Sequence, residues 1–244
     1  MNLIIDVGNT RTKFSLFNKG EMLISVPVDE FLPEHIRILQ NEHPSLNKAI
    51  ISSVRDYPVE LRKELQEKFD TFIEFNASTP IPFENHYRSK ETLGYDRLAA
   101  VAGANKLYPD SNILVIDAGT AVTFDFINDK NQYLGGNISP GIDLRFKALH
   151  SFTGKLPLVK QEESNTLFGD TTESAIRAGV QNGLIYEMDR TIESFNDSYN
   201  TLRVIMTGGN TIFFDKKLKS SFFVHLNLVA LGLNRILEYN MGDY

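Results

Sequence analysis

The fold is decided by residues 3–10, which read Leu-Ile-Ile-Asp-Val-Gly-Asn-Thr. A short run of large apolar residues that ends in Asp and then Gly is typical of a buried strand that stops at a tight turn. Residues 114–120 read Leu-Val-Ile-Asp-Ala-Gly-Thr and repeat the pattern, and in both copies a second strand-like run follows, at 13–17 and at 121–127. The echo predicts a duplicated α/β domain, although two buried strands that meet glycine turns can also look alike by chance.

Strand-like runs alternate with helix-length segments along the rest of the chain, as in α/β proteins. Strands are expected at residues 3–6, 13–17, 48–54, 112–118, 121–127 and 202–207, and helices at 59–69, 98–107, 171–195 and 227–239. Residues 76–89 contain two prolines and are expected to be irregular. The boundary between the copies is placed near Asp110-Ser111, which gives two α/β domains, 1–110 and 111–244.

Composition excludes several kinds of protein. The chain has 244 residues, a formal charge of −6 and no cysteine. Thiolate catalysis, cysteine-bound zinc, iron–sulfur clusters and disulfides are therefore excluded, and the acidic balance argues against a nucleic-acid partner. The first residues lack the features of a secretory signal, and the apolar runs are too short to span a membrane. We expect a cytoplasmic protein with no membrane partner.

The carboxylates at the two strand ends, Asp6 and Asp117, are the first candidates for chemistry. A carboxylate that closes a buried strand needs a cation or several hydrogen-bond donors, and a hydrated metal ion with nucleotide phosphates supplies both. Neighbouring residues could complete such a site through close backbone approach, hydroxyl groups and a positive charge: Gly8, Gly119, Thr10, Thr120 and Lys13. One Asp-x-Gly turn is a weak signal, but two at corresponding places are a stronger one.

A second candidate lies at residues 93–98, Leu-Gly-Tyr-Asp-Arg-Leu, just before an alanine-rich helix. The carboxylate of Asp96 could accept a proton from a substrate hydroxyl, and Arg97 could pair with an anionic substrate group. The alternative is an aspartate that only favours a helix N-terminus. Two glycine-rich segments, 135–141 and 206–210, are expected to be turns that could line a nucleotide site. The five histidines lack metal-ligand spacing.

Taken together, the motifs resemble those of a known family. The successive motifs are DVGNTRTK at 6–13, LGYDR at 93–97, DAGTAVT at 117–123, GGNISPG at 135–141 and GDTTESAIRAG at 169–179. In this order they look like the motifs of type III pantothenate kinases, over residues 1 to about 210. The resemblance implies an α/β fold with duplicated ribonuclease H-like domains of the acetate and sugar kinase, Hsp70 and actin superfamily, with ATP in the cleft between them.

The resemblance also implies an activity and a site. The activity is ATP-dependent phosphorylation of pantothenate to 4'-phosphopantothenate, the first step of coenzyme A biosynthesis. ATP would be bound by Asp6, Val7, Gly8, Asn9, Thr10, Arg11, Thr12, Lys13 and Thr120. Asp6 would act through hydrated Mg²⁺, and Asp117 would hold a monovalent cation, K⁺ or NH₄⁺. Pantothenate would contact Tyr87, Gly94, Tyr95, Asp96, Arg97 and Thr172, with Asp96 as the catalytic proton acceptor and Thr172 reaching across a homodimer interface.

Three other interpretations remain at this point. Another kinase or phosphatase of the same superfamily would share the Asp-x-Gly turns, although the LGYDR and GDTTESA segments argue against it. An ATP-switched structural or chaperone-like protein would usually be considerably longer. A regulatory protein that keeps the fold without turnover is not dismissed by the sequence, in which both turns and Asp96 are intact.

Overall fold

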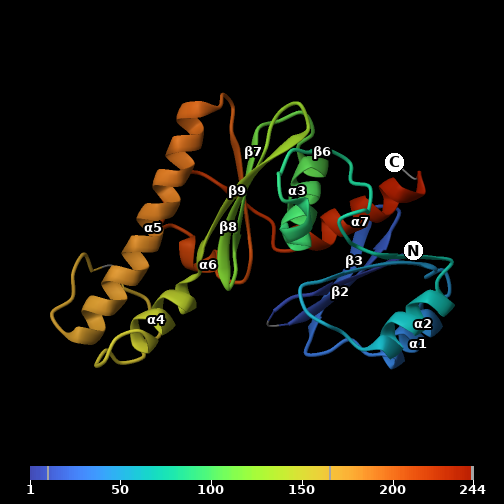
Figure 1. Ribbon diagram of the computed structural model, residues 1–244, viewed down its shortest axis with the longest axis horizontal. Coiled ribbons are helices and arrows are strands. Elements are labelled where there is room, and N and C mark those ends of the chain that lie inside the picture. Colours follow the sequence, from blue (N-terminus) through green and yellow to red (C-terminus); the bar gives the residue numbers. More distant parts are fainter. Residues whose placement is uncertain (10, 165, 243–244) are drawn as a thin grey trace. The chain divides into compact units, whose positions relative to one another are not determined.

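The computed structural model describes residues 1–9, 11–164 and 166–242. Contacts divide the chain into two compact units. Unit 1 comprises Met1–Asp110, Ile127–Leu134 and Asn227–Tyr244, and unit 2 comprises Ser111–Phe126 and Gly135–Leu226. Figure 1 labels the elements along the chain. Among the described residues, no helix is long and apolar enough to cross a membrane.

Unit 1 contains a five-stranded sheet in the order β3-β2-β1-β4-β5. Its strands are β1 (Asn2–Val7), β2 (Thr12–Asn18), β3 (Glu21–Val28), β4 (Lys48–Ser53) and β5 (Thr71–Glu74). The β1–β2 and β2–β3 pairs are antiparallel, whereas β4 runs parallel to both β1 and β5. Its helices are α1 (Pro33–Glu42), α2 (Val59–Lys68), η1 (Lys90–Thr92), α3 (Tyr95–Leu107) and α7 (Leu228–Met241).

Both faces of this sheet are covered, which explains the continuous apolar run of β1. Leu3 and Ile5 pack in one core with residues of α1 and α2. Ile4 and Ile50 point to the opposite face, where α7 and α3 contact the sheet, and they are equally buried. A strand that is buried on both faces reads as an uninterrupted apolar run rather than as an alternating one.

A six-stranded sheet has the order β11-β10-β7-β8-β9-β6; most of it belongs to unit 2, whereas β6 and the start of β9 belong to unit 1. Its strands are β7 (Ile113–Ala118), β8 (Ala121–Ile127), β9 (Gln132–Pro140), β10 (Arg203–Thr207) and β11 (Phe223–Val224), and the two-residue β6 (Glu84–Asn85) pairs with the start of β9. The order β9-β8-β7-β10-β11 repeats the order β3-β2-β1-β4-β5 of unit 1. The duplicated α/β fold predicted from the sequence echo is therefore confirmed.

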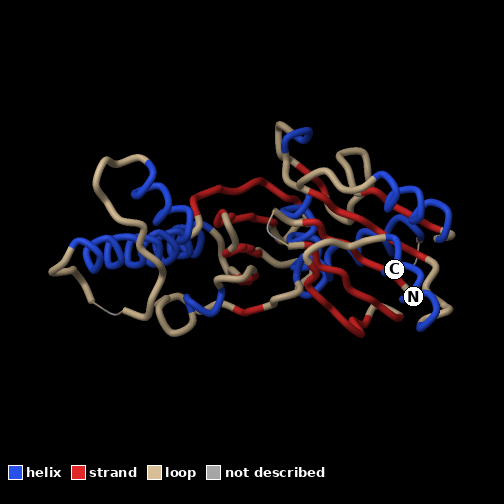
Figure 2. The backbone as a smooth tube through the Cα atoms, turned by 90° about the horizontal axis from the view of Figure 1, so that it is seen from below, coloured by secondary structure: helices blue, strands red, loops and turns tan. Residues whose placement is uncertain are grey.

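The helices of unit 2 are α4 (Ile142–Ser151), α5 (Thr172–Ser198) and the short α6 (Thr211–Phe214). Thr171 begins α5 with a capping box, because its hydroxyl accepts from the Ser174 amide at 3.2 Å while Ser174 Oγ accepts from the Thr171 amide at 2.9 Å. Figure 2 shows α5 as one uninterrupted helix. Its buried face, Ile176, Val180, Leu184, Met188 and Ile192, follows helical spacing and packs on the sheet residues of unit 2.

Two glycines let α3 and α7 touch backbone to backbone within unit 1. A Cβ built on Gly232 would overlap the carbonyl oxygen of Ala99, and a Cβ on Gly103 would overlap that of Leu228. No side chain fits between these helices at the crossing. Helix α7 is thereby held close to α3, and it also contacts β1 and β4.

A network of hydrogen bonds adds to these contacts of α7. Asn2 Nδ2 donates to Asn234 Oδ1 at 2.8 Å, and Asn234 Nδ2 donates to Glu238 Oε1 at 2.8 Å. The carboxylate of Glu238 also accepts from Lys106 Nζ at 3.1 Å. Because each buried amide has a partner, the network fixes α7 against β1 and α3 without leaving an unsatisfied group among its members.

Several elements differ from the sequence-based expectation. The helix expected at 98–107 begins at Tyr95, with Gly94 at the N-cap position. Residues 135–140 are strand β9 and not a turn, since the absent side chain of Gly136 lets the Phe124 backbone approach. Residues 227–242 pack in unit 1, although they follow unit 2 in sequence. The division into duplicated domains 1–110 and 111–244 stays a prediction.

Candidate active site

The first Asp-x-Gly turn connects β1 to β2 in unit 1. Asp6 lies opposite Lys13 in the antiparallel register, so a carboxylate and an ammonium group flank the turn. The turn is closed by the Gly8 amide, which donates to the Arg11 carbonyl at 3.1 Å. A Cβ on Gly8 would lie only 3.1 Å from that oxygen, which explains why the motif has glycine there.

The other residues of this motif present both buried and exposed groups. Thr12 is buried, at 2% exposure, whereas Asn9 and Arg11 are exposed. Lys13 is partly buried, and its Nζ donates to Asn227 Oδ1 at 3.4 Å. Thr10, which the sequence analysis also assigned to ATP, lies outside the described residues. The described part of the motif therefore brings two cationic side chains and one carboxylate to a single turn.

The second Asp-x-Gly turn lies at the end of β7 in unit 2, where Asp117 is the residue before the last one of the strand. A Cβ built on Gly208 would overlap Asp117 Oδ1, and one on Gly119 would lie 3.3 Å from the same oxygen. Gly208 also has a φ of +96°, a conformation that favours glycine. The two glycines thus let backbone pack closely against one oxygen of the Asp117 carboxylate.

A third glycine turn presses on the same place. The Gly141 amide donates to the Thr120 carbonyl at 3.0 Å, and a Cβ on Gly141 would overlap the carbonyl oxygens of Gly119 and Thr120. Asn210 Nδ2 donates to the Gly119 carbonyl at 3.3 Å. Carboxylate and carbonyl oxygens are therefore gathered at one turn, and such oxygens are the ligands that hard cations prefer.

The family resemblance implies a cation at each of the two Asp-x-Gly turns. Asp117 with its neighbouring carbonyls could hold a monovalent cation, and Asp6 offers the oxygen through which a hydrated Mg²⁺ could be held. Among the described residues, no three His, Asp or Glu side chains gather in a metal-binding group.

The LGYDR motif forms the start of α3 in unit 1. Asp96 lies in the first helical turn, where its Oδ1 accepts from the Arg97 amide at 2.8 Å. A Cβ on Gly94 would lie 2.5 Å from this oxygen, so the glycine makes room for the carboxylate. A carboxylate at a helix N-terminus is stabilised by the helix dipole.

The ring of Tyr87 lies against the neighbouring arginine, Arg97. Arg97 is buried, and its guanidinium carbon lies 5.6 Å from the centroid of the Tyr87 ring. Tyr87 stacks on Tyr133 with ring centroids 6.2 Å apart, and the Tyr95 ring lies 5.3 Å from that of Phe75. Tyr87 and residues 94–97, which were predicted from separate motifs, are therefore brought together within unit 1. Thr172 is the remaining residue that is predicted to contact pantothenate. It is exposed at the first position of α5 in unit 2.

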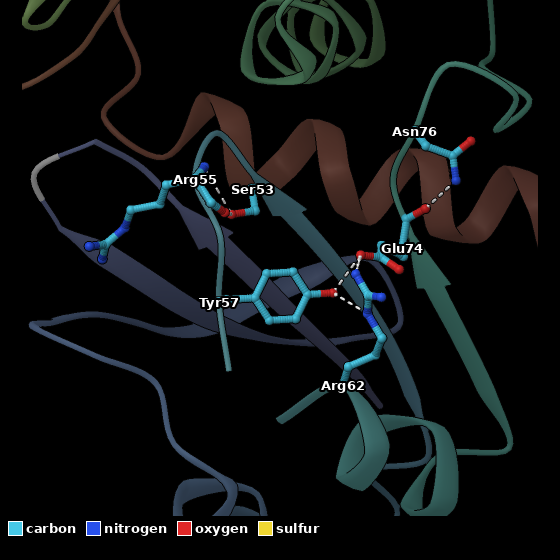
Figure 3. Close-up of polar contacts among 6 residues, drawn as sticks. All are labelled: Ser53, Arg55, Tyr57, Arg62, Glu74 and Asn76. Atoms are coloured by element: carbon cyan, nitrogen blue, oxygen red, sulfur yellow. Dashed lines mark hydrogen bonds and ion pairs between the residues drawn. The ribbon is translucent and has the colours of Figure 1, made fainter. Parts of the chain in front are cut away.

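Sequence reasoning missed a polar triad of Tyr57, Arg62 and Glu74, which is shown in Figure 3. The Tyr57 hydroxyl donates to Glu74 Oε1 at 2.7 Å, and Arg62 donates to both Glu74 and Tyr57. Burial raises the pKa of Tyr57 above its ordinary value, which keeps this donor protonated. The triad and Tyr95 line a cavity of about 350 Å³. Its members are spread over residues 57–95 and share no motif.

Comparison with known proteins first defines the class of protein. A putative N-acetylmannosamine kinase from Listeria monocytogenes has the same fold with a TM-score of 0.56 at 10% identity, covering 98% of this chain and 99% of that chain. A structure from Campylobacter jejuni described as a conserved putative Baf family transcriptional activator gives a TM-score of 0.61 at 23% identity, with coverage of 98% and 99%. The chain therefore shares the fold of these solved structures, and the two sheets of the same strand order belong to that fold.

Sequence similarity then defines the family. The family model for type III pantothenate kinase matches residues 2–194. A type III pantothenate kinase from Phocaeicola vulgatus is 45% identical over 240 residues, which are 98% of this chain and 99% of the relative. One from Bacteroides fragilis is 44% identical over 242 residues, 99% of each chain. This chain belongs to the type III pantothenate kinase family.

Proposed function

We propose that the protein transfers the γ-phosphoryl group of ATP to the primary hydroxyl of pantothenate and so forms 4'-phosphopantothenate, the first step of coenzyme A biosynthesis. The observation that carries this proposal is family membership over nearly the whole chain. The gathering of Asp96, Arg97 and Tyr87 at one end of α3 supports it. We also propose that the reaction takes place in the cytoplasm, because a chain without cysteine suits a reducing compartment.

Asp96 is proposed to be the catalytic base. Its carboxylate accepts the proton of the pantothenate hydroxyl while the new O–P bond forms and the bond from phosphorus to the ADP oxygen breaks. Arg97 binds the carboxylate of pantothenate, since a guanidinium offers paired donors to such a group. The Tyr87 ring holds the guanidinium in place from its face.

The turn at residues 6–13 is proposed to bind the phosphates of ATP. Arg11 and Lys13 supply positive charge, and the glycine turn allows close approach of the backbone to phosphate oxygens. Bound Mg²⁺ would neutralise further phosphate charge, with Asp6 holding it through water. Catalysis of phosphoryl transfer is mainly positioning and charge neutralisation, so no histidine or cysteine is required.

Asp117 is proposed to bind the monovalent cation, and Thr120 to contact ATP. The carbonyl oxygens of Gly119 and Thr120, which lie in the same turn as Asp117, support a cation site there. Potassium or ammonium would there add positive charge beside the phosphates. The residues of the second turn would then act on the nucleotide and not on pantothenate.

Replacing Asp117 by Asn is expected to weaken or abolish stimulation by potassium and to raise the KM for ATP, because the carboxylate that organises the cation is lost. The measurement is initial rate against potassium concentration, for the variant and the wild-type protein. Equal wild-type rates in potassium and in a bulky organic cation would contradict the monovalent site.

We further propose that the protein works as a homodimer. Unit 2 exposes several large apolar side chains, of which Phe152, Leu167 and Phe168 are at least three-quarters exposed. Apolar side chains exposed in this way mark interaction surfaces when they form a patch. Thr172 comes shortly after Leu167 and Phe168 in the sequence, and it would complete the pantothenate site of the neighbouring subunit.

Mixing two inactive variants tests the shared site. Asp96→Asn and Thr172→Arg are each expected to be nearly inactive, the first without its base and the second blocked by bulk and charge. In a mixed isologous dimer one site carries both changes and the other carries neither, so random exchange, which makes about half of all dimers mixed, should restore about a quarter of wild-type activity. If subunit exchange is demonstrated and activity does not return, Thr172 acts in its own chain and the shared-site proposal is wrong.

The function itself is tested by measuring ADP release with pantothenate, with a hexose and with no acceptor. Only a pantothenate kinase requires pantothenate for turnover. Release with the hexose would instead support a sugar kinase of the same fold. Acceptor-independent release, or none at all, would contradict the proposed activity.

A further inference from the structure

Arg55 lies in the loop that follows β4, and its side chain reaches the first Asp-x-Gly motif. Its Nη2 donates to Thr12 Oγ1 at 3.4 Å, although 43 residues separate the two in sequence. Thr12 is buried, while Arg55 is exposed. Figure 3 shows the Arg55 guanidinium directed away from Tyr57, Arg62 and Glu74. This arginine therefore takes no part in the triad beside Tyr95.

The backbone of the same loop is attached to the end of β1. The Val54 amide donates to the Val7 carbonyl at 3.1 Å. Ser53 Oγ accepts from the Arg55 amide at 3.3 Å and donates to the Arg55 carbonyl. The amide and the carbonyl of Arg55 are both hydrogen-bonded to Ser53, so the backbone of Arg55 is fixed beside β1, the strand that carries Asp6.

Arg55 also differs from several other arginines, because it has no ion-pair partner among the described residues. Several arginines of the described chain form ion pairs with glutamates: Arg37 with Glu64, Arg62 with Glu74, Arg145 with Glu187, Arg177 with Glu162 and Arg190 with Glu193. Within residues 1–9, 11–164 and 166–242, no carboxylate forms an ion pair with Arg55. An exposed cation held on a phosphate-binding motif without a carboxylate partner is suited to an anionic ligand.

We infer that Arg55 is a further phosphate-binding residue, whose guanidinium contacts phosphate oxygens of the nucleotide bound at residues 6–13. The inference rests on the proposed binding of nucleotide phosphates at this turn. A guanidinium has several N–H donors, and only one nitrogen is used on Thr12, so others remain for phosphate. Together with Lys13, Arg55 would neutralise the negative charge of the phosphates. The chain as a whole cannot do so, because its own net charge is negative.

The test is the binding of ATP and of adenosine to the full-length protein, measured by titration calorimetry without pantothenate. Arg55→Gln is expected to weaken ATP binding about tenfold and to leave adenosine binding unchanged, because a charge-assisted hydrogen bond to phosphate is lost. Arg37→Gln is the matched control, since it removes one exposed positive charge from α1 without touching the motif. It is expected to bind both ligands as the wild-type protein does.

Three results would overturn the inference: unchanged ATP binding in Arg55→Gln, equal weakening in Arg37→Gln, or equal loss of ATP and adenosine binding. If Arg55→Gln does not fold by circular dichroism, Arg55→Met replaces it with the same expectations. A wild-type protein that binds ATP but does not phosphorylate pantothenate would contradict the proposed function. The role of Arg55 would then still be decided by the ATP and adenosine binding of its variants.

Discussion

Replacing Asp96 by Asn is expected to lower turnover of pantothenate by about 100-fold or more while the protein folds normally. Asparagine keeps the size of the side chain, and its carbonyl oxygen can still accept from the Arg97 amide, as Asp96 Oδ1 does at 2.8 Å. The start of α3 is therefore preserved. The amide cannot take the hydroxyl proton, so the chemical step loses its base.

The measurement is kcat at saturating ATP and pantothenate, with thermal unfolding as the check on folding. Asp143→Asn is the matched control, because Asp143 is an exposed carboxylate in the first turn of α4. It shares the helix-terminal position of Asp96 but has no proposed role in catalysis. Turnover of Asp96→Asn within a few-fold of wild type would assign Asp96 to helix stabilisation alone.

The second large effect is expected from Gly232→Ala. A Cβ at this position would lie 2.6 Å from the carbonyl carbon of Ala99 and 2.8 Å from the amide nitrogen of Gly103. These are backbone atoms and cannot rotate away, so α3 and α7 would have to separate. Overpacking of this kind costs typically about 1–3 kcal/mol and more where backbone must move, and we expect a loss at the upper end of this range.

Gly183→Ala is the control for this change. Gly183 lies inside α5, and nothing lies within 4 Å of a Cβ built there. Alanine is the better helix former by about 1 kcal/mol, so this variant is expected to be neutral or more stable. Chemical unfolding curves of both variants provide the comparison. Equal stability of Gly232→Ala and the wild-type protein would mean that the helices can move apart without cost.

The sequence predicted those parts of the fold in which burial leaves an uninterrupted apolar run. Strands β1 and β7 are of this kind, and both end in the Asp-x-Gly turns from which the duplication was inferred. Strand β3 was not predicted, because none of its residues is buried and Pro27 interrupts it. In β9 the glycines pointed to a turn, whereas they allow close strand packing.

The candidate site was only partly accessible from the sequence. Asp6 and Asp117 were predicted because they close apolar runs. The residues predicted to contact pantothenate came from a family resemblance. The contact of Arg97 with Tyr87 joins a helix to an irregular segment, and no periodic pattern encodes it. The same holds for Arg55 and Thr12, which are adjacent only because β4 pairs with β1. Such pairs depend on strand order, which local sequence does not specify.

The position of α7 has a consequence for how the protein is made. Residues 227–242 leave the ribosome after all of unit 2, yet they cover Ile4 and Ile50 of unit 1. During translation the first sheet therefore waits with one apolar face open, while unit 2 already has its complete sequence. Nascent chains are expected to need protection from aggregation at this face until α7 has been synthesised and covers the sheet of unit 1.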